Sequence, residues 1–344
     1  MKDQRIIIVG AGMAGATTAY FLTRKGKRNI LLLEKEKVAG AQSTGRNAAI
    51  LRTIIPDPLA NRLARQSAEF YFNPPEGFSD LALVDRVGIF MAACAEHVPT
   101  LDAWCSRNAG AHIERSDASR LYAQIPVLAP GLQSVAYKPD DGILDVHAIL
   151  QGFLRGACRS GAQLRFGTQF HRLRIRDGRV EGVETGDGFL EASAVVVANG
   201  AWASAADSFG GYALPFTPYR RHLLVTEPLP QVNPRWPVLW VVGEDYYFRP
   251  ESGGLLMSAC DAVRVTPEQG EITDPDELER IAAKAARWLP TLAHAGVARA
   301  WAGMRTFAPD DRFVLGRDPR LEGLSWVAGR GGHTGRNYVT SRSA

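Results

Sequence analysis

The opening fifteen residues hold the feature that most constrains this chain of 344 residues. Ile6–Val9 form a continuous apolar run rich in β-branched residues, which is typical of a strand buried on both faces of a parallel sheet. Gly10, Gly12 and Gly15 follow at the spacing Gly-x-Gly-x-x-Gly. The first glycine of this pattern allows a tight turn, the second leaves room for a pyrophosphate, and the third lets a helix pack against the strand. The N-terminus of that helix offers free N–H groups and a positive dipole to a phosphate.

A glycine triplet alone is weak evidence, and the residues that follow it decide between two interpretations. The helix that begins at about Ala14 ends near Gly26, and a second apolar strand, Ile30–Leu33, leads directly into Glu34. An acidic side chain about 20 residues beyond the glycines can accept hydrogen bonds from a ribose 2′-OH. The alternative is a βαβ unit whose glycines only shape a turn, and the position of Glu34 favours dinucleotide binding.

The loop after Glu34 is a second candidate ligand contact. Residues 40–49 are small and polar and include a single arginine, Arg46. Such a loop can lie along an extended ligand, offering Ser43, Thr44 and backbone donors, and Arg46 can pair with a phosphate. A plain solvent-exposed connection is the alternative.

Composition excludes several other classes of protein. Charged residues make up 22% and hydrophobic residues 46%, and the net charge of +4 comes from dispersed arginines, so we expect no nucleic-acid partner. No apolar run reaches membrane-spanning length, and the chain enters a strand at once, which leaves no room for a leader. Cys94, Cys105, Cys158 and Cys260 have no CxxC spacing, and we expect reduced, mostly buried thiols in a cytoplasmic protein. No zinc-binding spacing is present, so no metal is expected.

Later signals predict alternation between two domains. A helix is expected over residues 57–72, another after the N-cap Asp145, and a third after the N-cap Asp274. Asp177-Gly178 predicts a hairpin, and residues 194–198 form an apolar strand expected to rejoin the first sheet. The intervening segments differ in pattern and composition, so the sheet domain is predicted to be interrupted twice.

Several of these motifs, in this order, resemble the FAD-dependent D-amino-acid oxidase superfamily over almost the whole chain. They are residues 10–15, Glu34, residues 140–145, residues 195–202 and residues 301–305. Within the superfamily the chain is most similar to the D-arginine dehydrogenase-like and glycine oxidase-like branch. That closer likeness is carried by residues 43–49, 72–78, 126–128, 219–221 and 246–250.

The resemblance implies a fold, a cofactor and a reaction. The fold is α/β, with an FAD-binding Rossmann-like domain of the glutathione-reductase type interleaved with an α+β substrate domain on a mostly antiparallel sheet. The implied FAD-binding domain comprises residues 1–79, 140–212 and 303–344, and the substrate domain residues 80–139 and 213–302. FAD is expected to bind non-covalently. The implied reaction is oxidation of a (D-)amino acid at Cα by hydride transfer to flavin N5. The imine hydrolyses to a 2-oxo acid and ammonia, and oxygen or another acceptor takes the electrons.

The resemblance also assigns site residues. Arg221 and Arg305 correspond to the pair that holds the substrate carboxylate, consistent with the planar guanidinium fork. Tyr247 corresponds to a hydroxyl donor at the same end of the substrate. The cofactor-binding residues implied are Gly10, Gly12, Met13, Ala14, Gly15, Glu34, Lys35, Ser43, Thr44, Arg46, Asn47, Ala48, Gly200, Trp202, Gly303, Arg305, Gly331, Gly332, His333 and Thr334.

Two departures from the branch bear on the substrate. Ile50 stands where the branch has a histidine, and Val87 and Gly88 stand nearest the acidic residue that reads a cationic side chain. A guanidinium bound there without a carboxylate would be an unpaired buried charge, so D-arginine is not the expected substrate. Ile50, Ile55 and Gly88 instead suggest a small or apolar side chain. A glycine- or sarcosine-type oxidase and a 2-hydroxy-acid dehydrogenase, which would require a base, remain alternatives.

The C-terminal residues also differ from the family. The family continues from a glycine-rich turn into a long helix facing the flavin, whereas residues 336–344 contain two bulky apolar residues and no helical stripe. The missing dipole would weaken the stabilisation of negative charge on the flavin. A flavin-binding or inactive copy is therefore the alternative from another class. His333, beside the turn, is a candidate helper in the reaction, with a structural role as its alternative.

Overall fold

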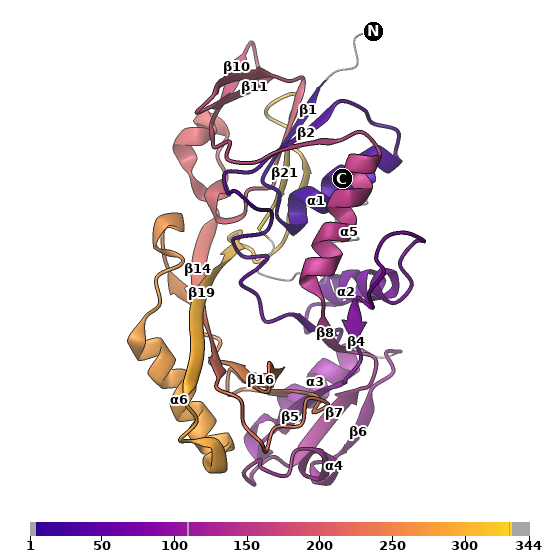
Figure 1. Cartoon of the computed structure of the whole chain (residues 1–344), viewed down its shortest axis with the longest axis vertical. Helices are drawn as coiled ribbons and strands as arrows, with labels where there is room; N and C mark the ends of the chain where they lie inside the picture. Colours follow the sequence, from indigo (N-terminus) through magenta and orange to yellow (C-terminus); the bar gives the residue numbers. More distant parts are fainter. Residues whose placement is uncertain (1–4, 109, 330, 332–344) are drawn as a thin grey trace.

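The computed structural model describes residues 5–108, 110–329 and 331 of the chain. Two large sheets lie toward opposite ends of the molecule, and two long strands, β14 (Thr217–Thr226) and β19 (Val297–Phe307), run between the ends (Figure 1). The expected α/β fold, with a Rossmann-like sheet and a largely antiparallel second sheet, is confirmed. The division into domains at the expected residue boundaries stays a prediction.

The first sheet has six strands and is parallel except at one edge. Its order is β20-β21-β13-β1-β2-β9. Ile7 at its centre pairs with Val195 on one side and Leu31 on the other, as expected for apolar strands buried on both faces. The strands are β1 (Ile6–Val9), β2 (Ile30–Leu33), β9 (Gln163–Arg165), β13 (Ala194–Val197), β21 (Leu324–Ala328) and the antiparallel β20 (Val314–Arg317).

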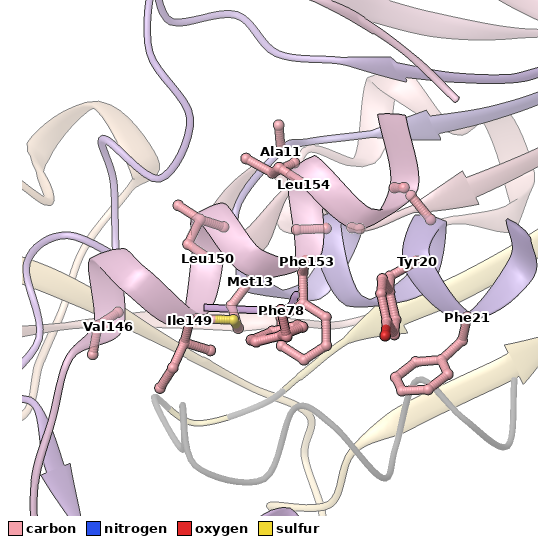
Figure 2. Close-up of a cluster of buried hydrophobic side chains, with 14 of the residues drawn as sticks. Ala11, Met13, Tyr20, Phe21, Phe78, Val146, Ile149, Leu150, Phe153 and Leu154 are labelled. Carbon is pink, nitrogen blue, oxygen red and sulfur yellow. The ribbon is translucent and has the colours of Figure 1, made fainter. Parts of the chain in front are cut away.

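Two helices pack closely against each other beside this sheet. They are α1 (Met13–Arg24), which starts directly after the glycine turn, and α5 (Val146–Arg159), capped by Asp145 as predicted. Figure 2 shows their contact, in which Tyr20 and Phe153 meet edge to face at 5.3 Å. A Cβ on Gly156 would lie 2.5 Å from the Tyr20 ring, so glycine there permits the close approach. This packing fixes the start of α1 relative to the sheet.

The second sheet has nine strands and is antiparallel except where β15 pairs with β5. Its longest ladder joins β14 to β19 over most of their lengths. The other strands are β5 (Ile89–Ala93), β6 (Glu114–Asp117), β7 (Ser134–Lys138), β15 (Val238–Val241), β16 (Tyr246–Glu251), β17 (Gly254–Ser258) and β18 (Val263–Arg264).

Smaller elements complete the described fold. The hairpin predicted at Asp177-Gly178 joins β10 (Phe170–Arg176) to β11 (Arg179–Thr185), and β12 (Gly188–Glu191) extends it. A second small sheet contains β3 (Ile50–Leu51), β4 (Val84–Asp85) and β8 (Gly142–Leu144). The remaining α-helices are α2 (Pro58–Phe72), α3 (Val98–Arg107), α4 (Ser119–Gln124) and α6 (Pro275–Trp288). The predicted helices at residues 57–72 and after Asp274 are confirmed.

The four cysteines are free, as expected, but they are not mostly buried. Cys158 is exposed on the surface of α5, and Cys94, Cys105 and Cys260 are each partly exposed. In the described part of the chain, no helix is long and apolar enough to cross a membrane. The same residues contain no cluster of three or more His, Cys, Asp or Glu side chains that could hold a metal ion.

Candidate active site

A first cavity, here called the cofactor cavity, opens at the carboxyl ends of β1, β2 and β13. This is where ligands bind in open parallel sheets. The predicted cofactor residues that line it are Gly10, Gly12, Met13, Ala14, Glu34, Lys35, Ser43, Thr44, Gly200, Trp202 and Gly331. The structure therefore gathers most of the predicted nucleotide contacts into one place.

Glycine is required at the turn by sterics as well as by conformation. Gly10 has φ of +100°, and a Cβ there would lie 2.7 Å from the Ala198 carbonyl oxygen on the neighbouring strand. A Cβ on Gly15 would lie 1.8 Å from the Gly10 carbonyl oxygen. Gly15 therefore does not line the cavity; it lets α1 approach the turn, as its place in the motif predicts.

Polar side chains at the cavity wall are already oriented. The buried carboxylate of Glu34 accepts hydrogen bonds from the Ala11 N–H (2.9 Å) and the Glu36 N–H (3.0 Å), which leaves lone pairs on both oxygens for a ligand. The Thr44 hydroxyl accepts a hydrogen bond from the Met13 N–H (3.1 Å) in the first turn of α1. The cavity thus presents a fixed acceptor at the second strand and a helix N-terminus at the first.

Two buried polar atoms in the cofactor cavity lack a hydrogen-bond partner among the described residues. They are Gln42 Oε1 and Asn199 Oδ1, neither of which the sequence reasoning had selected. A buried acceptor without a donor costs free energy, which a ligand that donates to it can recover. The glycine cradle, the oriented Glu34 and these acceptors fit the adenine dinucleotide FAD. Lys35 lies 3.8 Å from the centroid of the Trp202 ring at the same cavity.

A second cavity, here called the substrate cavity, lies between the loop of residues 43–55 and the larger sheet. Its volume is about 110 Å³. The residues that line it are Ser43, Arg46, Asn47, Ala48, Ala49, Ile50, Arg52, Ile55, Ala64, Leu144, Arg221, Leu223, Trp240, Tyr247, Gly303, Met304 and Arg305. Ser43 and Met304 line both cavities, so the two adjoin.

The three residues predicted to hold the substrate, Arg221, Tyr247 and Arg305, all line the substrate cavity. Arg221 pairs with Gly303 across the β14–β19 ladder, and Tyr219 pairs with Arg305. Since alternate residues of a strand share a face, Arg221 and Arg305 project from the same face as diagonal neighbours. Burial and the charge of Arg305 lower the pKa of Arg221. Burial raises the pKa of Tyr247 to about 12, so its hydroxyl remains a donor at neutral pH.

An arginine that the sequence reasoning missed, Arg52, also enters this cavity. Its guanidinium carbon lies 4.2 Å from the centroid of the Trp240 ring, and Trp240 stacks on Tyr247 with ring centroids 4.8 Å apart. Burial lowers the pKa of Arg52 to about 10. Its neighbours Leu51 and Ile54 are apolar, but this local pattern does not distinguish a buried arginine from an exposed one.

Hydrogen bonds tie the loop that separates the two cavities to the larger sheet. Ser43 Oγ donates to the Met304 carbonyl (2.7 Å), Trp301 Nε1 to the Arg46 carbonyl (3.2 Å), and Arg249 Nε to the Ala48 carbonyl (2.7 Å). Residues of this loop therefore form a wall common to both cavities.

Several predicted cofactor contacts occupy other positions in the structure. Arg46, Asn47, Ala48, Gly303 and Arg305 line the substrate cavity instead of the cofactor cavity. Arg46 pairs with Glu271 at 2.5 Å and donates to the Ala302 carbonyl, so its charge already has a partner. Asn47 Oδ1 accepts a hydrogen bond from the Ala49 N–H, which stabilises the loop. The assignments at Gly332, His333 and Thr334, and those on the tail, fall outside the described residues.

Only some of the residues used to predict the substrate's side chain lie in the substrate cavity. Ile50 and Ile55 line the substrate cavity as expected. Gly88 lines neither cavity, because it lies against the Tyr137 side chain, whose hydroxyl oxygen a Cβ would approach to 2.3 Å. Gly88 therefore accommodates Tyr137 and carries no information on substrate size.

His222 shows how β14 is held with Arg221 facing the cavity. His222 directly follows Arg221 and is buried on the opposite face of the strand. There its Nδ1 lies 2.8 Å from Asp261 Oδ2. Its Nε2 accepts a hydrogen bond from the Asp274 N–H at 3.0 Å. Arg220, also on that face, pairs with Asp274 at 2.9 Å. These contacts anchor the strand from behind.

Comparison with known proteins places the fold and the cavities in a family. A family model described as FAD dependent oxidoreductase (DAO) matches residues 5–334. The sarcosine oxidase subunit beta of Rhizobium meliloti is 26% identical over 91% of this chain and 77% of its own length. The glycine oxidase of Pseudomonas putida is 27% identical over 94% of this chain and 88% of its own. Other curated relatives are longer, and the chain spans about two fifths of their length.

A solved structure supports the fold alone. The L-proline dehydrogenase from P. horikoshii superimposes with a TM-score of 0.87 and 22% sequence identity, covering 98% of this chain and 90% of that one. The family model matches nearly all residues, and the curated relatives agree with it. The chain is therefore an FAD-dependent oxidoreductase that acts on amino acids or amines, and it belongs to the FAD dependent oxidoreductase (DAO) family.

Proposed function

We propose that the protein oxidises the Cα–N bond of a small α-amino acid, bound by its carboxylate to Arg221 and Arg305. The observation that supports this most strongly is the convergence of these two guanidinium groups on one cavity. Among the described residues neither makes an ion pair, and Arg221 Nε is buried without a hydrogen-bond partner. Two unpaired forks on adjacent strands suit the bidentate geometry of a carboxylate.

The protein's own groups position the substrate for the reaction. With the carboxylate held by Arg221 and Arg305, the Tyr247 hydroxyl donates at the same end, and Cα is directed toward the wall shared with the cofactor cavity. FAD, when bound non-covalently, supplies the acceptor for the hydride that leaves Cα. The resulting imine hydrolyses in water to a 2-oxo acid and ammonia, and oxygen or another acceptor finally takes the electrons.

The cavity lining favours an amine over a hydroxy acid as substrate. Its described lining residues include no histidine and no carboxylate, so no general base is at hand for a hydroxyl group. A neutral amine needs no such base. Ile50, Ile55 and Leu223 make part of this wall apolar, as expected for a small substrate, and a glycine- or sarcosine-type oxidase is equally compatible with it.

A flavin assay on the purified protein tests the proposal. We expect yellow protein whose flavin absorbance is bleached anaerobically by one or more small amino acids of D or L configuration, or by N-methylglycine. Arg305→Gln should keep its flavin but bleach at least about 100-fold more slowly, because a desolvated carboxylate loses its partner. Bound flavin that no amine or hydroxy acid bleaches would instead support a flavin-binding or inactive copy. Bleaching by a 2-hydroxy acid alone would contradict the choice of an amine.

A further inference from the structure

We propose that the substrate carries a second acid group, which binds to Arg52, so that the preferred substrates are small amino acids with two carboxylates. This rests on the proposed function, because it takes the first carboxylate to be held by Arg221 and Arg305. It replaces the expectation of an apolar side chain with a more specific substrate class.

The strongest support is the contrast among the arginines around the substrate cavity. Those with structural roles have acidic partners at short distance. Arg46 pairs with Glu271 (2.5 Å), Arg220 with Asp274 (2.9 Å) and Arg249 with Glu251 (2.8 Å). Within the described residues, three arginines line the cavity without an ion pair: Arg52, Arg221 and Arg305.

Arg52 is half-buried, and one end of its guanidinium group is removed from solvent. Its Nη1 is buried and has no hydrogen-bond partner in the described part of the chain. Burial and the charge of Arg305 lower its pKa more than nearby Cys260, Asp141 and Tyr247 raise it, so the cation is disfavoured at this position. A buried guanidinium donor left unsatisfied is costly, and an anionic ligand removes that cost.

The Arg52 side chain is also held in place before any ligand binds. Its guanidinium group lies over the Trp240 ring, which stacks in turn on Tyr247. The next residue, Thr53, is fixed because both its N–H and its hydroxyl bond to the buried Asp141 carboxyl, at 2.7 and 2.8 Å. A pre-positioned fork loses little conformational freedom on binding, which favours specific recognition.

The three arginines approach the cavity from two different walls. Arg221 and Arg305 project from the β14–β19 ladder, whereas Arg52 follows β3 in the loop of residues 43–55. A single carboxylate has two oxygens, which two guanidinium forks already engage. A second acid group on a short chain can therefore reach Arg52 while the first remains on Arg221 and Arg305. Aspartate, glutamate and N-(carboxymethyl)glycine have this form.

Acid and amide pairs of equal shape test the charge requirement in the flavin-loaded protein. Aspartate is compared with asparagine and glutamate with glutamine, as both enantiomers, by anaerobic flavin bleaching. We expect kcat/KM for the preferred acid to exceed that for its amide at least about tenfold, because a charged partner strengthens an arginine contact. In Arg52→Gln this ratio should fall to about one, and in Arg52→Lys to an intermediate value. Arg62→Gln, on the exposed face of α2, is the matched control and should keep the wild-type ratio.

Each other outcome overturns the inference. Equal rates for acid and amide in the unmodified protein would show that no second acid is read. A preference that survives in Arg52→Gln would assign it to another residue. Equal loss of both activities in that variant, with a shifted flavin reduction potential, would mean that Arg52 serves the flavin instead.

A binding measurement separates failure of this inference from failure of the proposed function. If no amino acid bleaches the flavin, the proposed oxidation fails, but succinate and butyrate can still be titrated while flavin absorbance is followed. Tighter binding of succinate by at least about tenfold, abolished in Arg52→Gln, would sustain the second anion site. Equal affinities for the two acids would overturn it. So would an equal loss of affinity for succinate and butyrate on addition of chloride, because that would show a site for inorganic anions only.

Discussion

The cofactor cavity and the substrate cavity are built in different ways. The first is lined largely by backbone and small residues from several strand ends, the glycine turn and the adjoining loops, about half of them within the first 44 residues. The second is lined by long side chains from β14, β15, β16, β19 and the loop after β3. A shape made by backbone tolerates few replacements but needs few long side chains. A set of arginines that project from different strands depends on each guanidinium group, whereas many of the residues around those arginines can be replaced.

The largest effect is expected where the backbone itself forms the cofactor cavity. Gly15→Ala would place a Cβ within 1.8 Å of the Gly10 carbonyl oxygen, so α1 must move away from the turn. We expect loss of bound flavin and a fall in the free energy of unfolding of about 3 kcal/mol or more, measured by absorbance and by urea denaturation. Gly211→Ala is the control, since nothing lies within 4 Å of a Cβ there. Full flavin content in Gly15→Ala would contradict this view of the turn.

The matching change in the substrate cavity should alter catalysis and leave the cofactor in place. Arg221→Met removes one fork from the carboxylate and should lower kcat/KM by about 100-fold, equivalent to about 2.7 kcal/mol. Flavin content and the midpoint of urea denaturation should stay near those of the unmodified protein. Arg28→Met, an exposed arginine far from the cavity, is the control. Flavin loss in Arg221→Met would show that the two cavities cannot be separated in this way.

A buried carboxyl behind the substrate cavity predicts a pH dependence of stability. Burial raises the pKa of Asp141 from 3.8 to about 7, despite the hydrogen bonds from Thr53. Between about pH 4 and pH 7 the folded protein keeps a proton that the unfolded chain releases. The free energy of unfolding should therefore decrease as pH rises through this window, by at most about 4 kcal/mol.

Urea denaturation at several pH values measures this decrease. Asp141→Asn can keep both contacts with Thr53, since its amide oxygen accepts from the N–H and its amide nitrogen donates to the hydroxyl. The variant should lack this part of the pH dependence. The same slope in both proteins would place the titrating group elsewhere.

The smallest effect is expected in the wall that the cavities share. Ala49 has φ of +55°, a left-handed conformation that is unfavourable for a residue with a Cβ. Ala49→Gly relieves that strain but increases the entropy of the unfolded chain, so we expect a change in stability within about 1 kcal/mol, toward greater stability. Ala48→Gly, without such strain to relieve, should be less stable than the unmodified protein. Destabilisation of both variants alike would argue against strain at Ala49.

The contrast between the cavities also explains what could be predicted from the sequence. The glycine turn, Glu34 and the caps at Asp145 and Asp274 act over short stretches, so their patterns identify them. Arg52 could not be placed in the same way, because its role depends on Trp240 and on strands that arrive nearly 200 residues later. Gly88 was misinterpreted for a similar reason, since its neighbour Tyr137 is distant in sequence. Arg46 was assigned to a phosphate because its partner Glu271 could not be foreseen.

The hydrogen bonds that tie residues 43–48 to β16 and β19 have a consequence for how the two ligands affect each other's binding. A loop that contacts both ligands loses conformational freedom when either of them binds. Entropy already lost when the flavin docks need not be lost again when the amino acid arrives. Each molecule should therefore bind more tightly when the other is already bound, by the same factor in both directions.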